Sequence, residues 1–250
     1  MRTEPAMISI KEKFWRLVRP ARNAVIRAQQ RPRVGCIDWG DFDTTRPINA
    51  NWGYERGMPI DRYYIGRFLE RNAGYIRGRV LEVAGNEYTE MYGGDRVERS
   101  DILHPAEGNP RATIIADLEE PSQVTDELFD CIICTQTLQL VFDVNTAMAN
   151  LYRFLKPGGV LLMSVPGISQ ICREDMDITG DYWRFTTAAL QRLLGAQFPA
   201  DAVRIESHGN VKTSIGFLHG ISATEISEDD LLEKDPQFQL LLTVAATKPR

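Results

Sequence analysis

Apolar and polar residues follow one another in blocks along this chain, and the clearest block runs from Phe129 to Pro166. It contains an apolar β-branched run, a polar turn, a helical pattern over 144–155, a Lys-Pro-Gly-Gly stop and a second apolar run. Strands that are apolar throughout are typical of a parallel sheet covered on both faces. The block therefore predicts a strand, a crossover helix and a second strand parallel to the first.

The same patterns predict further elements on either side of this block. Three apolar runs before it each end in or near an acidic residue, and two more apolar runs follow it. The predicted strands are 79–85, 96–101, 112–118, 202–207 and 238–246, and the predicted helices are 61–70, 187–194 and 213–226. Strands that alternate with helices predict an α/β fold.

The first sixty residues differ in character from the rest. Residues 1–35 are basic, and apolar residues recur there at helical spacing around an interrupting Pro20. They are Phe14, Leu17 or Val18, Ala21 and Val25. Such a helix could contact a membrane surface, nucleic acid or a partner, but we favour a helix laid across the domain or a partly ordered arm. Residues 36–60 are predicted to be an ordered loop. The chain is thus divided into an extension, 1–60, and a domain, 61–250.

Composition narrows the class of protein. With 250 residues, of which 43% are hydrophobic, the chain can bury one substantial core. Its net charge of -5 argues against a nucleic-acid-binding protein. Because the chain has no membrane-spanning run and no signal-peptide core, we expect a cytoplasmic protein without stable membrane insertion. Cys131 and Cys134 lie in a predicted strand, where odd spacing sends them to opposite faces and favours two buried residues over a metal or disulfide pair.

Acidic residues end three successive predicted strands at Glu82, Asp101 and Asp117. The carboxyl edge of a parallel sheet is where open α/β sheets bind ligands. An acid after the second strand suits ribose hydroxyls, and one after the third suits the adenine amine. Gly85 would let the backbone approach the ligand closely. The pattern therefore predicts a bound adenosine group, with helix capping and loop hydrogen bonds as the alternative role for Glu82 and Asp117.

Two motifs resemble those of class I S-adenosylmethionine-dependent methyltransferases. They are FDxI at 129–132 and LKPGG at 155–159, the latter followed by an apolar strand. The chain looks closest to a type 11-like bacterial subset associated with glycans and natural products, which shares the segments 59–64 and 181–186. The resemblance covers 59 to about 248. It implies a Rossmann-like, seven-stranded, mostly parallel sheet with helices on both faces and an antiparallel last strand between the fifth and sixth.

The resemblance also implies the residues that contact S-adenosyl-L-methionine. It assigns the ribose to Asp101 and the adenine to Asp117 and Leu118, with Thr135 and Gln136 lying along the cofactor. The complete set of cofactor-binding candidates is Arg62, Glu82, Gly85, Asn86, Tyr88, Asp101, Ile102, Asp117, Leu118, Thr135 and Gln136.

The first motif departs from the family pattern. The usual sequence is an acid, any residue, then Gly-x-Gly-x-Gly, whereas Glu82 is followed here by a single glycine, Gly85, one position late. About ten residues separate that glycine from Arg96, so we expect one or two helical turns in between. Tyr88 or Arg62 is expected to replace some of the contacts to the methionine end of the cofactor.

The sequence offers no clear general base, because Leu140 stands where many relatives have a histidine. Asp181 and Asp177 are the favoured catalytic candidates, since their segment should cover the ligand edge of the sheet. Other candidates are Glu174, His104, His208 and His219. Methyl transfer from a sulfonium can also proceed by in-line positioning with no base. Glu174, Asp175 and Asp177 could hold a divalent metal, but they have no fixed ligand spacing, and we predict no metal site.

The candidates for contact with the acceptor are aromatic residues and one cation. They are Tyr63, Tyr64, Tyr182, Trp183 and Arg184. This combination suits a sugar face or an anionic group. Equally, Trp183 could anchor the segment in the core and Arg184 could form an ion pair with an acid at the sheet edge. The sequence predicts methylation of an oxygen, less favourably a nitrogen, of a small or sugar-containing acceptor by a possible homodimer. A scaffold or binding protein of the same fold is the rival.

Overall fold

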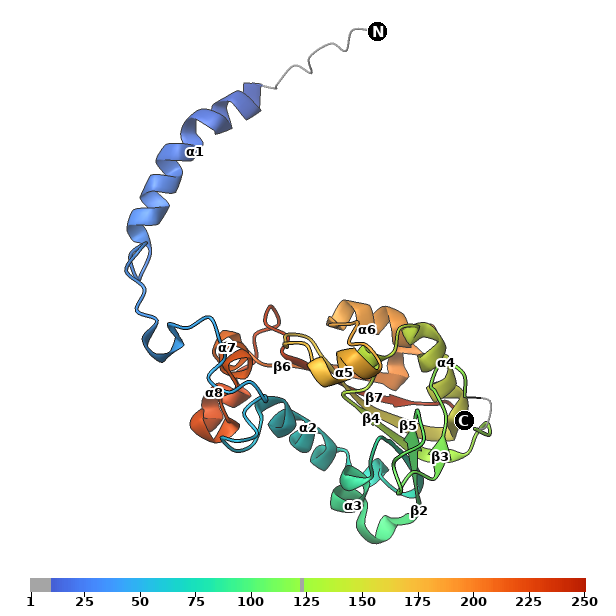
Figure 1. The fold of residues 1–250 in the computed structure, drawn as a ribbon. Helices are drawn as coiled ribbons and strands as arrows, with labels where there is room; N and C mark the ends of the chain where they lie inside the picture. Colours follow the sequence, from blue (N-terminus) through green and yellow to red (C-terminus); the bar gives the residue numbers. More distant parts are fainter. Residues whose placement is uncertain (1–9, 122–123) are drawn as a thin grey trace. The chain divides into compact units, whose positions relative to one another are not determined.

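The computed structural model describes residues 10–121 and 124–250, and the chain divides into two compact units between Thr45 and Arg46 (Figure 1). In the first unit, α1 (Ile10–Gln29) continues through Pro20 and is followed by irregular chain with one short turn, η1 (Gly40–Phe42). No described helix has both the length and the apolar character needed to cross a lipid bilayer.

The second unit is built on a seven-stranded sheet with the order β3-β2-β1-β4-β5-β7-β6. The strands are β1 (Gly78–Val83), β2 (Val97–His104), β3 (Ile114–Ile115), β4 (Phe129–Thr135), β5 (Leu155–Pro166), β6 (Val203–His208) and β7 (Leu241–Thr247). β7 pairs antiparallel with both β5 and β6, and every other pair is parallel. The predicted sheet, with its antiparallel last strand between the fifth and sixth, is confirmed.

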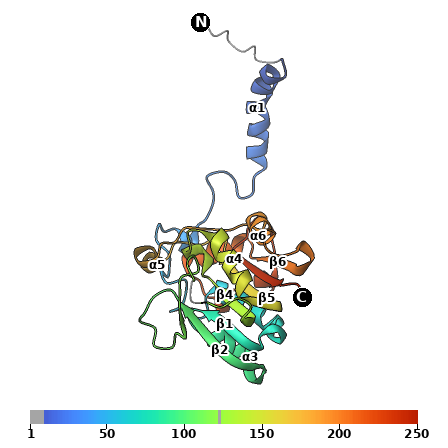
Figure 2. The ribbon, with the colours of Figure 1, turned by 90° about the vertical axis from the view of Figure 1, so that its right-hand side faces the viewer.

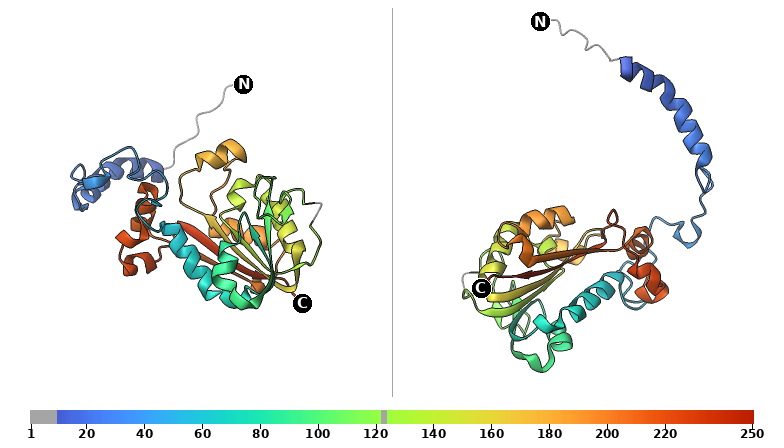
Figure 3. Two further views of the ribbon diagram at one scale, coloured as in Figure 1. Left: turned by 60° about the horizontal axis from the view of Figure 1, so that its bottom comes forward. Right: turned by 180° about the vertical axis from the view of Figure 1, so that it is seen from behind.

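Helices cover both faces of this sheet (Figures 2 and 3). One face packs against α4 (Val144–Phe154) and α6 (Thr187–Leu194), and the other against α2 (Ile60–Arg71), α7 (Val211–His219) and α8 (Glu228–Leu232). The remaining helices, α3 (Glu87–Gly93) and α5 (Arg173–Ile178), are short. Each buried aliphatic or aromatic side chain contributes about 1.5–3 kcal/mol to this core.

The two cysteines of β4 lie in different layers of the core. Cys131 packs with the α2 and α7 layer, and Cys134 with the α4 and α6 layer, as the odd spacing predicts. Both are free thiols. Burial raises the pKa of Cys131 and that of Cys134, the latter to about 12, so both behave as small apolar residues.

Three predicted boundaries are wrong, each for a local reason. β2 does not stop at Asp101, because its ladder with β1 continues as far as the Val83–Leu103 pair. The helix predicted over 213–226 ends at His219, because Gly220 takes a left-handed conformation (φ +68°) that closes the last turn. The predicted strand 112–118 is reduced to β3, so Asp117 follows it in a loop.

Candidate active site

The first turn after β1 is organised by Glu82. Its buried carboxylate accepts hydrogen bonds from the N–H groups of Tyr88 (3.2 Å) and Thr89 (2.7 Å) and from the Thr89 hydroxyl (2.7 Å). Burial raises the pKa of Glu82 although these bonds oppose the shift. The side chain therefore stabilises the start of α3, and α3 itself has the one to two turns expected of this crossover.

The turn between Glu82 and α3 is tied to β2 through Ala84. Ala84 has a left-handed φ of +73°, and its N–H donates to the Leu103 carbonyl of β2 (2.8 Å). A Cβ on Gly85 would collide with the Glu87 carboxylate, so a larger residue there would have to displace that side chain. Asn86 immediately precedes α3, and its side chain is held by Arg111 and by Glu90 (3.0 Å).

Asp101 lies inside the sheet. Its side chain is 1% exposed and accepts hydrogen bonds from Arg79 (2.6 Å), Arg99 (3.2 Å) and the Thr113 hydroxyl (3.0 Å). Burial acts to raise the pKa of Asp101, but these donors outweigh it and lower the pKa. Both carboxylate oxygens thus have protein partners, and His104 stands at the end of β2 instead.

The other cofactor candidates follow β2, β3 and β4. Asp117 is exposed in the loop, whereas Leu118 and Ile102 are buried in the core. Thr135 is the last residue of β4. Gln136 follows it in a left-handed conformation (φ +48°). Its N–H donates to the Ser164 carbonyl of β5 (2.9 Å), so its side chain is aimed out of the sheet edge by a constrained backbone.

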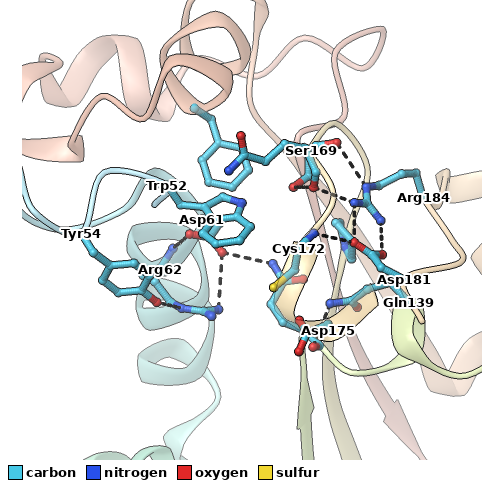
Figure 4. Close-up of a pocket in the computed structure, with 14 residues that line it drawn as sticks. Trp52, Tyr54, Asp61, Arg62, Gln139, Ser169, Cys172, Asp175, Asp181 and Arg184 are labelled. Atoms are coloured by element: carbon cyan, nitrogen blue, oxygen red, sulfur yellow. Dashed lines mark hydrogen bonds and ion pairs between the residues drawn. The ribbon is translucent and has the colours of Figure 1, made fainter. Parts of the chain in front are cut away.

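A cavity of about 190 Å³ opens beside Gln136 (Figure 4). The residues that line it come from the loop before α2, the start of α2, the turn after β4, the segment after β5, and α7. They are Trp52, Tyr54, Asp61, Arg62, Gln136, Gln139, Pro166, Ser169, Gln170, Cys172, Asp175, Asp181, Arg184 and Phe217. The cavity therefore brings together four of the predicted site residues: Arg62, Gln136, Asp181 and Arg184.

Asp61 is the titratable group of the cavity wall that sequence reasoning missed. The residue is 6% exposed, and its carboxylate accepts from the Arg62 N–H (2.8 Å) and from Gln136 Nε2 (3.2 Å) and faces the Arg62 guanidinium at 3.4 Å. Burial raises the pKa of Asp61 above its ordinary value even though Arg62 opposes the shift. The one signal in the sequence is its place in the segment 59–64, at the start of the predicted helix 61–70.

Arg62 and Tyr88 are neighbours near this wall. Arg62 Nε donates to the Tyr54 hydroxyl (2.8 Å). Burial raises the pKa of Tyr88, and the nearby Arg62 charge acts in the opposite direction. The two residues proposed to replace cofactor contacts are thus close enough to interact with each other.

Gln139 lines the cavity and carries an unsatisfied acceptor. Its Nε2 donates to the Gln136 carbonyl (2.8 Å), and its backbone carbonyl accepts from the N–H of Tyr182 (2.7 Å). Its Oε1 is buried and has no hydrogen-bond partner within the described residues. A buried acceptor without a partner costs about 1–3 kcal/mol, so a donor from a ligand would be stabilised there.

Asp181 and Arg184 form an ion pair on the opposite wall (Figure 4). Arg184 donates to both carboxylate oxygens of Asp181 (2.6 and 2.9 Å), and Cys172 N–H adds a third bond (2.9 Å). The burial of Asp181 acts to raise its pKa, but Arg184 outweighs it and the pKa is lowered. Arg184 also donates to the carbonyls of Ser169 (3.3 Å) and Gln170 (2.6 Å), so it ties the two ends of this segment together.

The remaining candidates do not line the cavity. Asp177 is exposed on α5. Tyr64 is 3% exposed and donates to the Leu231 carbonyl (2.9 Å), which makes it a core residue. Tyr63 packs edge-on against Tyr64, with ring centroids 5.5 Å apart. Tyr182 and Trp183 lie outside against Phe142, and the Trp183 indole donates to the Val141 carbonyl (3.0 Å).

The other histidine and acid candidates contribute no metal site. Among the residues that the structure describes, no group of three or more His, Cys, Asp or Glu could hold a metal ion. His208 is buried on the core side of β6, where its ring meets the Thr243 hydroxyl (2.9 Å) and burial lowers its pKa to about 4. Glu174 is exposed on α5, and His219 is the last residue of α7.

Comparison with known proteins assigns the family. Residues 72–163 match the family described as "Methyltransferase domain", a stretch that contains β1, β2, the Gln136 turn and most of β5. Over this stretch, which is less than half of the chain, the protein carries a methyltransferase domain, and its sheet has the fold of S-adenosylmethionine-dependent methyltransferases. S-adenosylmethionine is the cofactor of this methyltransferase family. No curated protein matches the sequence.

Solved structures share the fold of this methyltransferase at low identity. A SAM-dependent methyltransferase from Archaeoglobus fulgidus is 15% identical, with 75% of this chain and 94% of that one covered and a TM-score of 0.51. The partner of the Haloferax volcanii Trm112 methyltransferase activator is 14% identical, with 80% and 94% covered and a TM-score of 0.52. The [4+2]-cyclase SpnF is 17% identical, with 95% of both chains covered and a TM-score of 0.50.

Proposed function

We propose that this methyltransferase transfers the methyl group of S-adenosylmethionine to a hydroxyl oxygen of a small, sugar-containing or natural-product acceptor. The observation that carries the proposal is the pair of hydrogen-bond acceptors on the cavity wall, the Asp61 carboxylate and the Gln139 Oε1. Gln139 Oε1 has no donor at all among the described residues, and the Asp61 carboxylate, although it accepts from Arg62 and Gln136, has lone pairs left for one more donor. A volume of about 190 Å³ is room for roughly six water molecules, which suits one small ring.

The residues at the sheet edge fit the cofactor. The turn at Ala84 and Gly85 lies at the carboxyl end of β1, where Ala84 is exposed, and the exposed Asp117 can accept a hydrogen bond from an adenine amine. Thr135 and Gln136 would lie beside the cofactor between that turn and the cavity. When bound, S-adenosylmethionine supplies an electrophilic methyl group on a sulfonium. Because Asp101 is engaged by two arginines, we assign it to holding β1 and β2 together rather than to the ribose.

Asp61 is the proposed proton acceptor. Its raised pKa makes it a stronger base than an exposed aspartate, and Gln136 holds the carboxylate oxygen that would take the proton from the acceptor hydroxyl. Asp61 would take the proton from that oxygen as the oxygen–carbon bond forms and the methyl carbon–sulfur bond breaks, which leaves S-adenosylhomocysteine. Asp181 is a weaker base because its pKa is lowered and Arg184 occupies both of its oxygens, so we assign it a positioning role.

Nitrogen is the second candidate nucleophile. An amine N–H can also satisfy Asp61 and Gln139, but a protonated amine would have to lose its proton beside the Asp61 carboxylate, which stabilises the charged amine. The rival of another class is a protein of this fold without methyl transfer. The fold likeness to the [4+2]-cyclase SpnF favours testing that rival, because one fold hosts several chemistries.

Two measurements separate these possibilities. Calorimetric titration with S-adenosylmethionine should give saturable binding, and absence of binding would sink the enzyme proposal. Release of S-adenosylhomocysteine is then followed over a panel of simple sugars, phenols and primary amines. We expect turnover on hydroxyl compounds. Turnover on amines alone would replace oxygen by nitrogen, and binding without turnover on any member would favour the rival.

A further inference from the structure

The helix α1 (Ile10–Gln29) has an apolar face that no described element of its own unit covers. Residues 18, 21, 25 and 28 are Val, Ala, Val and Ala at the spacing of one helix face, and all four are exposed. Val25 is 58% exposed. In the sequence, the same spacing extends back to Phe14. The only other element of residues 10–45 is the short turn η1, which has no buried residue.

Positive charge surrounds this face. The helix carries six Lys and Arg against one Glu, a net charge of +5, whereas the whole chain has -5. The rest of the chain is therefore at -10, so the basic charge is concentrated on one helix. At 100° per residue, Arg22 borders the apolar face, and Arg19 and Arg27 lie further round on either side.

We propose that α1 is a membrane-surface anchor that lies on anionic phospholipid with its apolar face buried at the headgroup boundary. An apolar stripe beside a strongly basic polar face is typical of helices that lie in the membrane interface. A helix that bound nucleic acid would use the charge but would leave the apolar stripe unexplained. A helix with a net charge of +5 complements an anionic leaflet and has too many charges to enter its core. The inference does not rest on methyl transfer.

The test uses the full chain and sucrose-loaded vesicles of phosphatidylcholine with and without phosphatidylserine. We expect co-sedimentation with the phosphatidylserine vesicles, weak binding to phosphatidylcholine alone, and release by salt. Each Arg to Gln change should weaken binding about fivefold, so the triple Arg19→Gln, Arg22→Gln, Arg27→Gln variant should lose about 100-fold. The matched triple Arg to Lys variant should bind like the wild type. Val18→Asp with Val25→Asp should also abolish binding, through the apolar face.

Several outcomes would overturn the anchor. They are no binding to phosphatidylserine vesicles, equal binding to both lipids, or full binding by the triple Gln variant. Binding of the protein to a DNA or RNA duplex, without binding to vesicles, would also overturn the anchor and would indicate nucleic acid as the ligand of α1. The circular dichroism spectrum and the affinity for S-adenosylmethionine should be the same in the variants and the wild type. A failure of the membrane-anchor proposal can therefore be distinguished from a failure of the proposed methyl transfer.

Discussion

Replacing Asp181 with alanine tests whether this residue positions the segment after β5 or acts as a base. Its side chain is 3% exposed and is held by Arg184 and by the Cys172 N–H, while Arg184 spans back to the carbonyls of Ser169 and Gln170. Asp181→Ala removes the charge partner of Arg184 and three hydrogen bonds, so the wall of the cavity should loosen together with the fold.

The magnitude follows from what the variant leaves behind. Breaking a fully buried ion pair costs about 3–5 kcal/mol, because the remaining charge is desolvated and unpaired. Arg184 is 24% exposed and keeps its carbonyl bonds, which reduces the cost. We expect about 2 kcal/mol of lost stability, equivalent to a drop in Tm of about 6 °C for a domain of this size.

Thermal and urea unfolding measure the effect, with Asp177→Ala as the matched control because Asp177 is an exposed acid on the same segment. The control should change stability by less than about 0.5 kcal/mol. Since the pKa of Asp181 is lowered from 3.8, its contribution is full above pH 3.8 and is lost as the pH falls through the folded-state pKa. The difference in unfolding free energy between the wild type and Asp181→Ala should therefore disappear in acid. Equal effects of the two variants, or a gap unchanged in acid, would refute the positioning role.

Three further changes separate structural from chemical roles. Glu82→Ala leaves two N–H groups of α3 without their acceptor and should cost about 2–3 kcal/mol in urea unfolding, with Glu82→Gln intermediate. Tyr64→Phe removes the bond to the Leu231 carbonyl and should cost about 1 kcal/mol without changing the KM for the acceptor found in the panel. Asp61→Asn should lower kcat at least about 100-fold and abolish the acid limb of the pH–rate profile, since a base with a raised pKa loses activity as the pH falls through that pKa. An unchanged acid limb would exclude Asp61.

The sheet could be predicted because its strands carry two independent signals. β4 and β5 each contain a continuous apolar run, which is typical of a strand covered on both faces, and the motifs FDxI and LKPGG mark where they begin. The edge strands were less predictable. β3 has two residues and pairs with β2 alone, so its run of apolar residues overstated its length. The end of a strand depends on its pairing with a neighbouring strand, and the local sequence does not determine that pairing.

The site was less predictable because burial decides which acid reacts. The sequence predicts Asp101 as a ribose ligand and Asp181 as a base, and it does not single out Asp61. In the structure Asp101 and Asp181 meet arginines and have lowered pKa values, whereas Asp61 is buried with a raised one. The arginines that lower them come from neighbouring strands or from three residues away. Asp61 also faces an arginine, Arg62, but there burial outweighs it, and this balance becomes visible only once the chain is folded.

The glycine-poor first motif is the departure that most favoured a protein without cofactor binding, and the backbone argues against that interpretation. Ala84 occupies the position of the first family glycine and adopts the left-handed conformation that a glycine would provide, at a cost of about 1–2 kcal/mol. The turn tolerates this cost because the Ala84 N–H bonds to β2 and its carbonyl accepts from Asn109 (3.0 Å). Glu82 fixes the other side by accepting from the first N–H groups of α3. Strain that is held in place by three anchors at the ligand edge of the sheet is what a preformed binding geometry would require, and Ala84 supplies here the backbone conformation that a glycine would adopt.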